Sequence, residues 1–298
     1  MKNVTVLLSS YNGEKYISDQ IKSIYAQKEV NVSLIVRDDG SNDNTIKLLR
    51  MLGKKLNFKW YSGDNIGAAF SFQELLFDCN LDSDYYAFSD QDDIWKEEKL
   101  IKGINKMIRF EDVPCLYYSN YEIVDNQLNN LKSVKLKLYT LGNTILGQAP
   151  LGCTMILNKK MIEIVRKKKS EKMRMHDHWC LLTCLAYDGK VIYGHEKTLL
   201  YRQHSNNVVG GNPDINTKIK RYYRSFFYGN NERLQQILEF KKIHGSYLSQ
   251  NNINIINLIC SYKECLINKI RVIFNRQLKT GSFFKDIIFI ISIIFNRF

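Results

Sequence analysis

Three carboxylates occur within four residues of the sequence, directly after a short apolar and aromatic run. They are Asp90, Asp92 and Asp93, and the run is 85–88. A run of this kind is typical of a buried strand, so the carboxylates are expected together at its carboxyl end. Three negative charges so close together are costly unless a cation or several hydrogen-bond donors offset them. Because hard oxygen ligands suit Mg²⁺ or Mn²⁺, we expect a divalent ion that carries a phosphate ester.

Two further polar turns, 9–13 and 37–41, also follow apolar runs that are typical of strands. Helical patterns separate these runs, which predicts right-handed βαβ units and a parallel sheet. Ligands bind such sheets at the carboxyl ends of the strands, where all three turns are expected to lie. The convergence favours a binding site over the alternative of a solvated acidic turn in which Asp92 or Asp93 caps the next helix.

The pattern along the chain predicts an α/β fold class with a mainly parallel central sheet and a helical C-terminal region. We divide the chain into a catalytic domain, 1–217, and a basic tail, 218–298. The expected strands are 4–8, 32–36, 58–61, 85–88, 115–121 and 151–157, and the expected helices are 17–25, 44–52, 68–77 and 97–110.

The net charge of +13 is concentrated in the tail. Residues 218–298 contain 14 Lys and Arg against 4 Asp and Glu, which leaves +3 for 1–217. Such a segment is expected to meet an anionic partner, either a lipid surface or nucleic acid. The apolar run 287–295 is too short to span a bilayer and, among nearby basic residues, predicts an interfacial anchor. Alternatively, the tail packs on the catalytic domain as a helical hairpin or forms a homodimer interface.

The seven cysteines contain no CxxC pair. His176, Cys180 and Cys184 follow one another at helical spacing, which makes a zinc pair conceivable. The apolar run 179–186 favours packing inside a buried helix instead. The odd cysteine count and the absence of a signal peptide predict a cytoplasmic location.

Six motifs occur in order, and together they resemble glycosyltransferase family 2, the inverting enzymes of GT-A fold that use nucleotide sugars. The sequences at 89–95 and 175–179 are most similar to the bacterial rhamnosyltransferase branch. The resemblance to the family covers roughly residues 2–212. The motifs are Ser10-Tyr11-Asn12, Asp38-Asp39-Gly40-Ser41, Asn65-Ile66-Gly67, Asp90-Gln91-Asp92-Asp93, His176-Asp177-His178-Trp179 and Tyr201-Arg202-Gln203-His204.

The resemblance implies a nucleotide-sugar site along the first half of the chain. Asp39 is expected to accept the N3–H of a pyrimidine, although an Asp-Gly turn carboxylate is the alternative. The usual later Asn of the donor-side loop is replaced by Phe70 or Ser71. The residues assigned to the nucleotide sugar are Ser9, Tyr11, Asp39, Asn65, Gly67, Asp90 and Arg202, of which Arg202 is expected to pair with phosphate.

The resemblance further implies a metal site, a catalytic base and an acceptor site. Asp92 and His204 are expected to bind Mg²⁺ or Mn²⁺, with Asp93 as a helix cap or an outer group. Asp177 matches the base that takes the proton of the acceptor hydroxyl; the alternative is an N-cap of the helix beginning at Trp179. The residues assigned to the acceptor sugar are Trp95, His178 and Trp179.

The activity implied is transfer of L-rhamnose from dTDP-L-rhamnose to a polyprenyl-diphosphate-linked glycan at the inner face of the cell membrane. The alternative donor is a UDP-hexose such as UDP-galactose or UDP-glucose. A nucleic-acid-binding protein is the main rival, because aromatic and basic side chains alternate over 220–227. It leaves the acidic cluster unexplained, since those carboxylates repel phosphate. Gly210-Gly211 would permit a lid over the donor.

Overall fold

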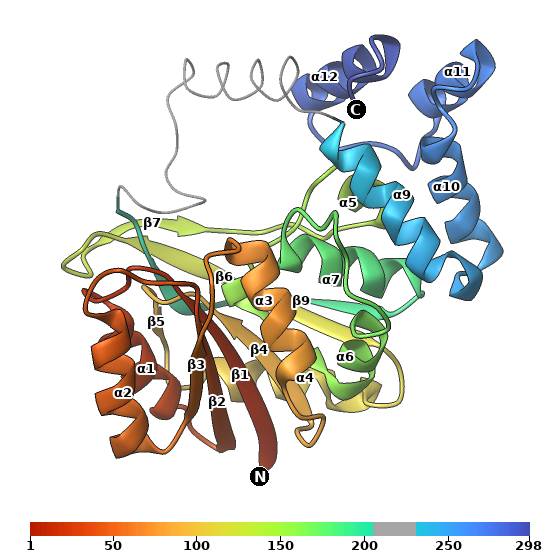
Figure 1. Cartoon of the computed structure of the whole chain (residues 1–298). Helices are drawn as coiled ribbons and strands as arrows, with labels where there is room; N and C mark the ends of the chain where they lie inside the picture. Colours follow the sequence, from red (N-terminus) through yellow and green to blue (C-terminus); the bar gives the residue numbers. More distant parts are fainter. Residues whose placement is uncertain (205–230) are drawn as a thin grey trace.

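The computed structural model describes residues 1–204 and 231–298, and its centre is a mixed sheet (Figure 1). The strands of the first 90 residues are parallel to one another, as expected, in the order β3-β2-β1-β4. Their bounds are β1 Lys2–Ser10, β2 Val30–Asp38, β3 Lys59–Ser62 and β4 Tyr85–Ser89.

The sheet continues from β4 through strands of both directions. β8 is antiparallel to β4 and β6, β6 and β9 are parallel, and β5 and β7 pair antiparallel with β9 and β6. These strands are β5 Ile94–Trp95, β6 Cys115–Val124, β7 Asn130–Val134, β8 Met155–Asn158 and β9 Lys190–Arg202.

Helices cover both faces of the sheet, which explains why the parallel strands are apolar without interruption. On β4, Tyr85 and Ala87 point into one core, and Tyr86 and Phe88 point into the other. α1, α2 and α4 pack in the first core, and α3, α6 and α7 pack in the second. Their bounds are α1 Ile17–Tyr25, α2 Thr45–Leu56, α3 Ala68–Asp78, α4 Lys99–Met107, α6 Lys159–Val165 and α7 His176–Ala186.

The predicted elements of the first 121 residues are confirmed, with shifts at their ends. The strand expected over 151–157 differs, because a 3₁₀ turn, Gly152–Thr154, precedes the short β8. The long β9 and the outer β7 were not predicted. Asp177 lies inside the first turn of α7, whose N-cap is Met175, so the N-cap alternative for this carboxylate is wrong.

The described part of the tail consists of four helices that gather at one corner of the molecule, beside α7 (Figure 1). They share an apolar core with the catalytic domain, to which they contribute Leu234, Phe240, Ile256, Phe289 and Ile293. The packing alternative therefore holds for this segment, while the boundary expected at 217/218 lies outside the described residues. The helices are α9 Glu232–His244, α10 Gln250–Cys260, α11 Leu266–Phe274 and α12 Phe283–Ile294.

Polar contacts also join the tail to the domain. The Glu239 carboxylate of α9 accepts hydrogen bonds from the backbone N–H groups of Glu171 and Lys172, at 2.9 and 2.7 Å. Lys137 and Gln148 both donate to the carbonyl oxygen of Thr280, just before α12. Within the described ranges, no helix combines the length and apolar character needed to cross a bilayer.

Candidate active site

A cavity of about 330 Å³ lies at the carboxyl ends of β1, β2 and β4, where the sequence predicted a binding site. Eight of the predicted site residues line it, and they come from five separate segments of the chain. The lining residues are Ser9, Tyr11, Asp39, Asn65, Gly67, Ala68, Phe72, Asp90, Gln91, Asp92, Leu151, Gly152, Met175, His176, Asp177 and Tyr201.

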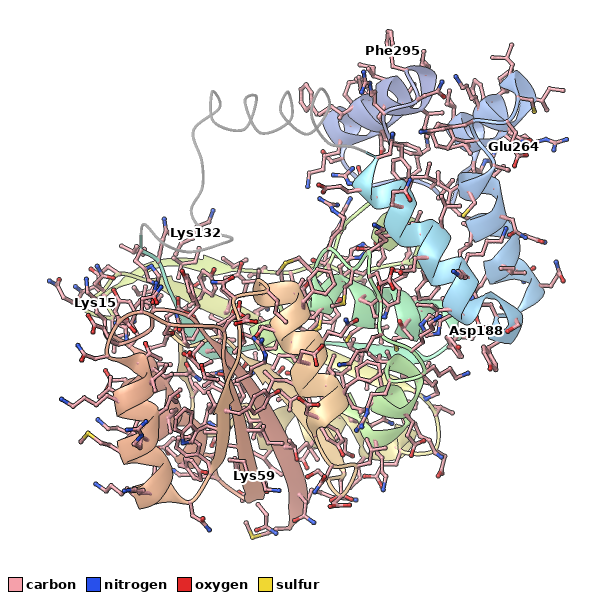
Figure 2. The ribbon with its side chains drawn as sticks, in the orientation of Figure 1. Lys15, Lys59, Lys132, Asp188, Glu264 and Phe295 are labelled. Atoms are coloured by element: carbon pink, nitrogen blue, oxygen red, sulfur yellow. The ribbon has the colours of Figure 1, made fainter. Side chains whose placement is uncertain are left out.

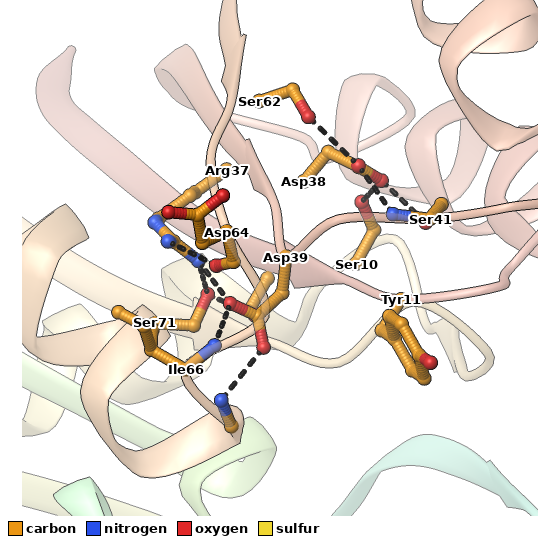
Figure 3. A network of polar contacts seen from close by, with 12 residues as sticks. Ser10, Tyr11, Arg37, Asp38, Asp39, Ser41, Ser62, Asp64, Ile66 and Ser71 are labelled. Atoms are coloured by element: carbon orange, nitrogen blue, oxygen red, sulfur yellow. Dashed lines mark hydrogen bonds and ion pairs between the residues drawn. The ribbon is translucent and has the colours of Figure 1, made fainter.

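Asp38, at the end of β2, holds the first two polar turns together (Figure 3). Its buried carboxylate accepts hydrogen bonds from the hydroxyls of Ser10, Ser41 and Ser62, at 3.2, 2.6 and 3.2 Å. It also accepts from the backbone N–H of Ser41 at 2.9 Å. Asp38 therefore has a structural role, and it leaves the neighbouring Asp39 facing the cavity.

Asp39 organises the donor-side loop (Figure 3). Its Oδ1 accepts from the Arg37 guanidinium and from the backbone N–H of Ile66, and its Oδ2 accepts from the N–H of Gly67 at 2.9 Å. Gly67 has a φ of +81°, a conformation that glycine adopts without strain, and it begins α3. Because a carboxylate oxygen can accept two hydrogen bonds, Oδ2 retains acceptor capacity among the described contacts for a group entering the cavity.

Ser9 and Tyr11, from the end of β1 and the turn after it, also line the nucleotide side of the cavity. The hydroxyl of Ser9 lies 2.6 Å from that of Ser71, to which Arg37 also donates. Gln91 binds the backbone of Tyr11 twice, accepting from its N–H at 2.8 Å and donating to its carbonyl at 2.9 Å. The Tyr11 ring is 44% exposed, which leaves it free to contact a base.

The three carboxylates at the end of β4 occupy different environments. Asp90 and Asp92 line the cavity, whereas Asp93 is fully buried and accepts a hydrogen bond from the backbone N–H of Arg202. Burial and the adjacent Asp92 charge raise the pKa of Asp90 to about 7 and that of Asp93 well above its usual value. The cluster is therefore short of positive charge, as expected of a site that receives a cation.

Two sets of donor atoms in this cluster fit a divalent ion to different degrees. His204 Nε2 lies 2.8 Å from Asp92 Oδ2, so the two predicted metal ligands meet at the cavity edge. A carboxylate and an imidazole are suitable ligands for Mg²⁺ or Mn²⁺ when phosphate oxygens and water complete the coordination. Donor atoms of Asp90, Asp93 and Cys153 also lie within 4.8 Å of one another. Burial raises the pKa of the Cys153 thiol, which disfavours thiolate, so this second set fits less well.

Arg202 differs from the prediction that it pairs with phosphate. It is buried, does not line the cavity, and donates to the carbonyl oxygens of Asp92 and Asn126, at 3.0 and 2.6 Å. Its guanidinium also lies over the Tyr16 ring, 4.8 Å from the centroid. The contacts indicate that Arg202 positions the loop that carries Asp92. Asp93 is likewise no helix cap, because Glu98 occupies the N-cap of α4.

Asp177 lies on the wall opposite the nucleotide side, in the first turn of α7. Its Oδ2 accepts from the backbone N–H of Gly152 at 3.1 Å, and its Oδ1 accepts from that of His178 at 2.6 Å. Burial raises the pKa of this carboxyl to about 6. A carboxylate held at two points, with a pKa near neutrality, is suited to take a proton from a bound hydroxyl.

His176 lines the same cavity and has no hydrogen-bond partner on either ring nitrogen among the described residues. Its ring stacks on Phe72 at 3.9 Å between centroids, and burial lowers its pKa to about 3. A Cβ at Gly152 would lie 2.3 Å from its Nε2, so glycine is needed at that position. His176 is therefore a neutral imidazole, and Cys180 and Cys184 beyond it are buried in the core.

Two of the three predicted acceptor residues are core residues, which corrects that prediction. Trp95 is 2% exposed and is covered by the buried Lys99, whose Nζ lies 4.7 Å from the ring centroid. Trp179 is also 2% exposed, because Phe240 of α9 packs edge-on against its ring at 5.3 Å. Neither indole offers a face to a sugar.

The third predicted acceptor residue, His178, lines a groove beside the cavity but is held by two hydrogen bonds. Gln236 of α9 donates to its Nδ1 at 2.8 Å, so its Nε2 carries the proton and donates to the carbonyl oxygen of Thr144 at 2.6 Å. This arrangement fixes the tautomer, and burial lowers the pKa of His178 to about 4.

Several lining residues were not predicted, and their sequence signals differ. Gln91 stands within the acidic motif itself, so its position directly beside Asp90 was a usable signal. Tyr201 belongs to one of the motifs and Met175 directly precedes another, but neither had a role assigned to it. Leu151 comes from a segment with no polar motif of its own, and only the tertiary structure places it here.

Comparisons with known proteins agree with this geometry. The model of the family "Glycosyl transferase family 2" matches residues 5–165. The dTDP-rhamnosyl transferase RfbG of Shigella flexneri is 33% identical over 230 residues, which cover 72% of this chain and 77% of that protein. The UDP-Glc:alpha-D-GlcNAc-diphosphoundecaprenol beta-1,3-glucosyltransferase WfgD of Escherichia coli is 31% identical over 163 residues, covering 53% and 61%.

Solved structures show the same fold. The crystal structure of S. aureus TarS 1-349 in complex with UDP has a TM-score of 0.56 at 16% identity, over 93% of this chain and 76% of that chain. The complex of the same protein with UDP-GlcNAc also has a TM-score of 0.56, covering 98% and 90%. The predicted GT-A fold is thus confirmed. The chain belongs to glycosyl transferase family 2, is a glycosyltransferase, and within the family is most similar to the rhamnosyltransferase branch.

Proposed function

We propose that this protein is a metal-dependent, inverting glycosyltransferase that transfers L-rhamnose from dTDP-L-rhamnose to a lipid-linked glycan. The observation that carries the proposal is the division of one cavity into two walls. Asp39, Asn65 and Gly67 line the cavity on the nucleotide side, and Asp177 lines it from α7. Similarity to RfbG, named as a dTDP-rhamnosyl transferase, supports the choice of donor.

In this mechanism Asp177 acts as the general base. As its carboxylate takes the proton of the acceptor hydroxyl, the hydroxyl oxygen forms a bond to the anomeric carbon. The bond from that carbon to the diphosphate breaks on the opposite side, and its electron pair leaves with the nucleoside diphosphate. One displacement inverts the configuration, and the N–H groups of Gly152 and His178 hold the base in place during the step.

Asp92 and His204 would hold the divalent ion, whose chemical contribution is to neutralise charge on the leaving diphosphate. Arg202 keeps the Asp92 loop in position from behind. Asp39 would accept the N3–H of thymine or uracil, and Tyr11 would lie against the ring. Asp90 would accept a hydrogen bond from the ribose, because it lines the same cavity.

The donor is tested with a panel of nucleotide sugars. Turnover with dTDP-L-rhamnose is compared with turnover of UDP-glucose and UDP-galactose on one acceptor; we expect dTDP-L-rhamnose to be fastest. Thermal protection by dTDP, UDP, GDP and ADP in the presence of Mn²⁺ tests the base, since only ligands of the folded state raise the melting temperature. Equal protection by purine nucleotides would contradict a pyrimidine site. Faster turnover of a UDP-hexose would mean that this hexose, and not rhamnose, is the sugar transferred.

We further propose that the protein works at the inner face of the cell membrane, held there by the tail. Ten large apolar side chains on and next to α11 and α12 are exposed, among them Phe274 and Phe284 at 77% each. Phe295 and Glu264 mark the end of the molecule farthest from Lys59 in the view of Figure 2. Apolar insertion combined with basic charge is the pattern of a reversible surface anchor.

Substitution of exposed tail residues tests the anchor better than truncation after Gly281, because Phe289, Ile293 and Phe298 are part of the core. Phe274→Gln with Phe284→Gln should reduce cosedimentation with anionic vesicles. The matched control is Met51→Gln with Leu131→Gln, two exposed apolar residues outside the tail. Equal vesicle binding by the two pairs would mean that the anchor lies elsewhere.

The nucleic-acid alternative rested on 220–227, and the lid rested on Gly210-Gly211. Both segments lie outside the described residues. The cavity residues favour the enzyme, because Asp90, Asp92 and Asp177 would repel a nucleic-acid backbone.

A further inference from the structure

A second cavity, of about 160 Å³, lies between the catalytic domain and the tail, and it is rich in basic side chains. Arg174, Arg233, Lys285 and Arg297 line it, and Glu232 is the one carboxylate among the lining residues. Arg174 pairs with Glu232 at 3.3 Å, so the lining retains a net charge of +3. Basic groups that converge from three segments on a small cavity attract an anion.

A glycine and two hydrogen bonds shape the backbone around this cavity. Gly147 has a φ of +88°, and a Cβ at that position would lie 3.1 Å from Arg233 Nε. The hydrogen bonds from Lys137 and Gln148 to the Thr280 carbonyl fix the segment that enters α12. Arg174, Lys285 and Arg297 are exposed and Arg233 is half-buried, so the cations stand at the solvent-facing rim of this cavity.

A continuous groove connects this cavity with the active site. The groove has a volume of about 830 Å³ and shares Leu151, Met175 and Asp177 with the active-site cavity. At its other end it shares Gly147, Arg174 and Glu232 with the basic cavity. Two residues separate Arg174 from Asp177. Their Cα atoms are therefore at most about 11 Å apart.

We infer that the basic cavity binds the diphosphate of a lipid-linked acceptor, whose glycan lies in the groove and presents its hydroxyl to Asp177. The inference rests on the proposed function and identifies where the acceptor of that reaction is held. Arg recognises phosphate oxygens through paired hydrogen bonds, and three of the four cations are Arg. The short path from Arg174 to Asp177 indicates an acceptor with few sugars between the diphosphate and the reacting hydroxyl.

The position of α12 would allow it to contact the lipid tail of the acceptor. One side of this helix lines the basic cavity with Lys285, Ile288 and Phe289, while Phe284 and Ile291 are exposed on another side. A lipid tail leaving the cavity would thus meet the exposed apolar surface of α12. The same helix binds the charged group and faces the bilayer.

The test uses two pairs of variants that remove equal charge from the tail of the full-length protein. Lys285→Gln with Arg297→Gln changes the basic cavity, and Arg276→Gln with Lys279→Gln changes two exposed residues that do not line it. The acceptor is a short glycan on a prenyl diphosphate, compared with the same glycan on an uncharged alkyl chain.

For the cavity pair we expect a rise in the acceptor KM of about 10- to 100-fold with the diphosphate acceptor, as for loss of hydrogen bonds to charged groups. We expect less than about threefold with the alkyl acceptor and with the control pair. An equal rise in the acceptor KM for both pairs would mean that these cations bind anionic phospholipid headgroups, which would overturn the inference. An unchanged KM in the cavity pair would overturn it as well.

Donor hydrolysis and transfer to the alkyl acceptor separate this inference from the proposed function. If the unmodified protein turns over the donor and uses the alkyl acceptor as well as the diphosphate acceptor, the enzyme assignment stands and the diphosphate site fails. If no nucleotide sugar is turned over at all, the proposed function fails first. Binding of geranyl diphosphate in the presence of saturating UDP, which blocks the donor cavity, gives a second readout independent of turnover.

Discussion

The nucleotide wall of the active site and its acceptor side are built in different ways. The nucleotide wall consists of the end of β1 and the segments that follow β1, β2, β3 and β4, and every residue predicted there except Arg202 lines the cavity. The acceptor side is assembled from α7, the segment before it and the tail. Trp179 of α7 was assigned to the acceptor sugar, as was Trp95 of β5 in the other core, and both are buried.

The difference teaches that donor chemistry in this protein is local, whereas acceptor recognition depends on long-range packing. Asp39 and Asp92 face the cavity because a strand ends just before each of them. His178 is oriented by Gln236, 58 residues later in the chain, and Trp179 is covered by Phe240 of the same helix. Changes at the donor wall should therefore remove activity outright, and changes at the acceptor side should act through the structure that surrounds it.

The largest effect is expected for Asp92→Asn. The amide keeps the size of the side chain but loses the charge that attracts a divalent ion, so transfer supported by Mn²⁺ or Mg²⁺ should be abolished. Circular dichroism should show an unchanged fold. Turnover is measured with and without EDTA, and full activity of the variant in EDTA would refute a metal at Asp92.

Asp177→Asn should lower turnover by about two to four orders of magnitude, because the amide cannot take a proton. Binding of the nucleotide should persist, since the donor wall is unchanged. In the unmodified enzyme, the base works only when deprotonated, and its pKa is about 6. Activity should thus fall by about tenfold per pH unit below that value. A loss of less than about fivefold in the variant would assign Asp177 to structure.

Gln236→Leu should reduce turnover by about tenfold and destabilise the fold by about 1–3 kcal/mol, because it leaves one buried and one partly buried group without their partner. These groups are Nδ1 of His178 and the backbone N–H of Arg174. Gln250→Leu, an exposed glutamine on the next tail helix, is the control. If both variants keep full turnover, the acceptor side does not depend on the tail, and the contrast between the two walls weakens.

The smallest effect on transfer is expected for Trp95→Phe and Trp179→Phe. Since both indoles are in the core, the acceptor KM should change by less than about twofold, while stability falls by about 1–2 kcal/mol. Acceptor kinetics and thermal melting measure the two quantities. A large rise in the acceptor KM without a change in melting temperature would indicate that the replaced Trp contacts the sugar directly.

Much of the fold could be predicted because strand and helix periods are local properties. Val4, Val6 and Leu8 alternate along β1, and Ile17, Ile21 and Ile24 repeat on one face of α1; all six are fully buried. The long β9 was missed, because Lys190–Arg202 mixes charged and apolar residues and gains its pairing with β6 from a partner 75 positions earlier. The same limit applies to Arg202, whose carbonyl partners belong to other segments.

The sequence by itself determined the order of strands and turns, and with it the carboxylates and glycines of the donor wall. It did so because a parallel strand places whatever follows it at the binding edge of the sheet. The tertiary structure alone decided which side chains remain open to a substrate. Phe240 covers Trp179, and Gln236 donates a hydrogen bond to His178. Arg174, Lys285 and Arg297 line one cavity. Burial is a property of the segment that covers a residue, and that segment lies far away in the chain.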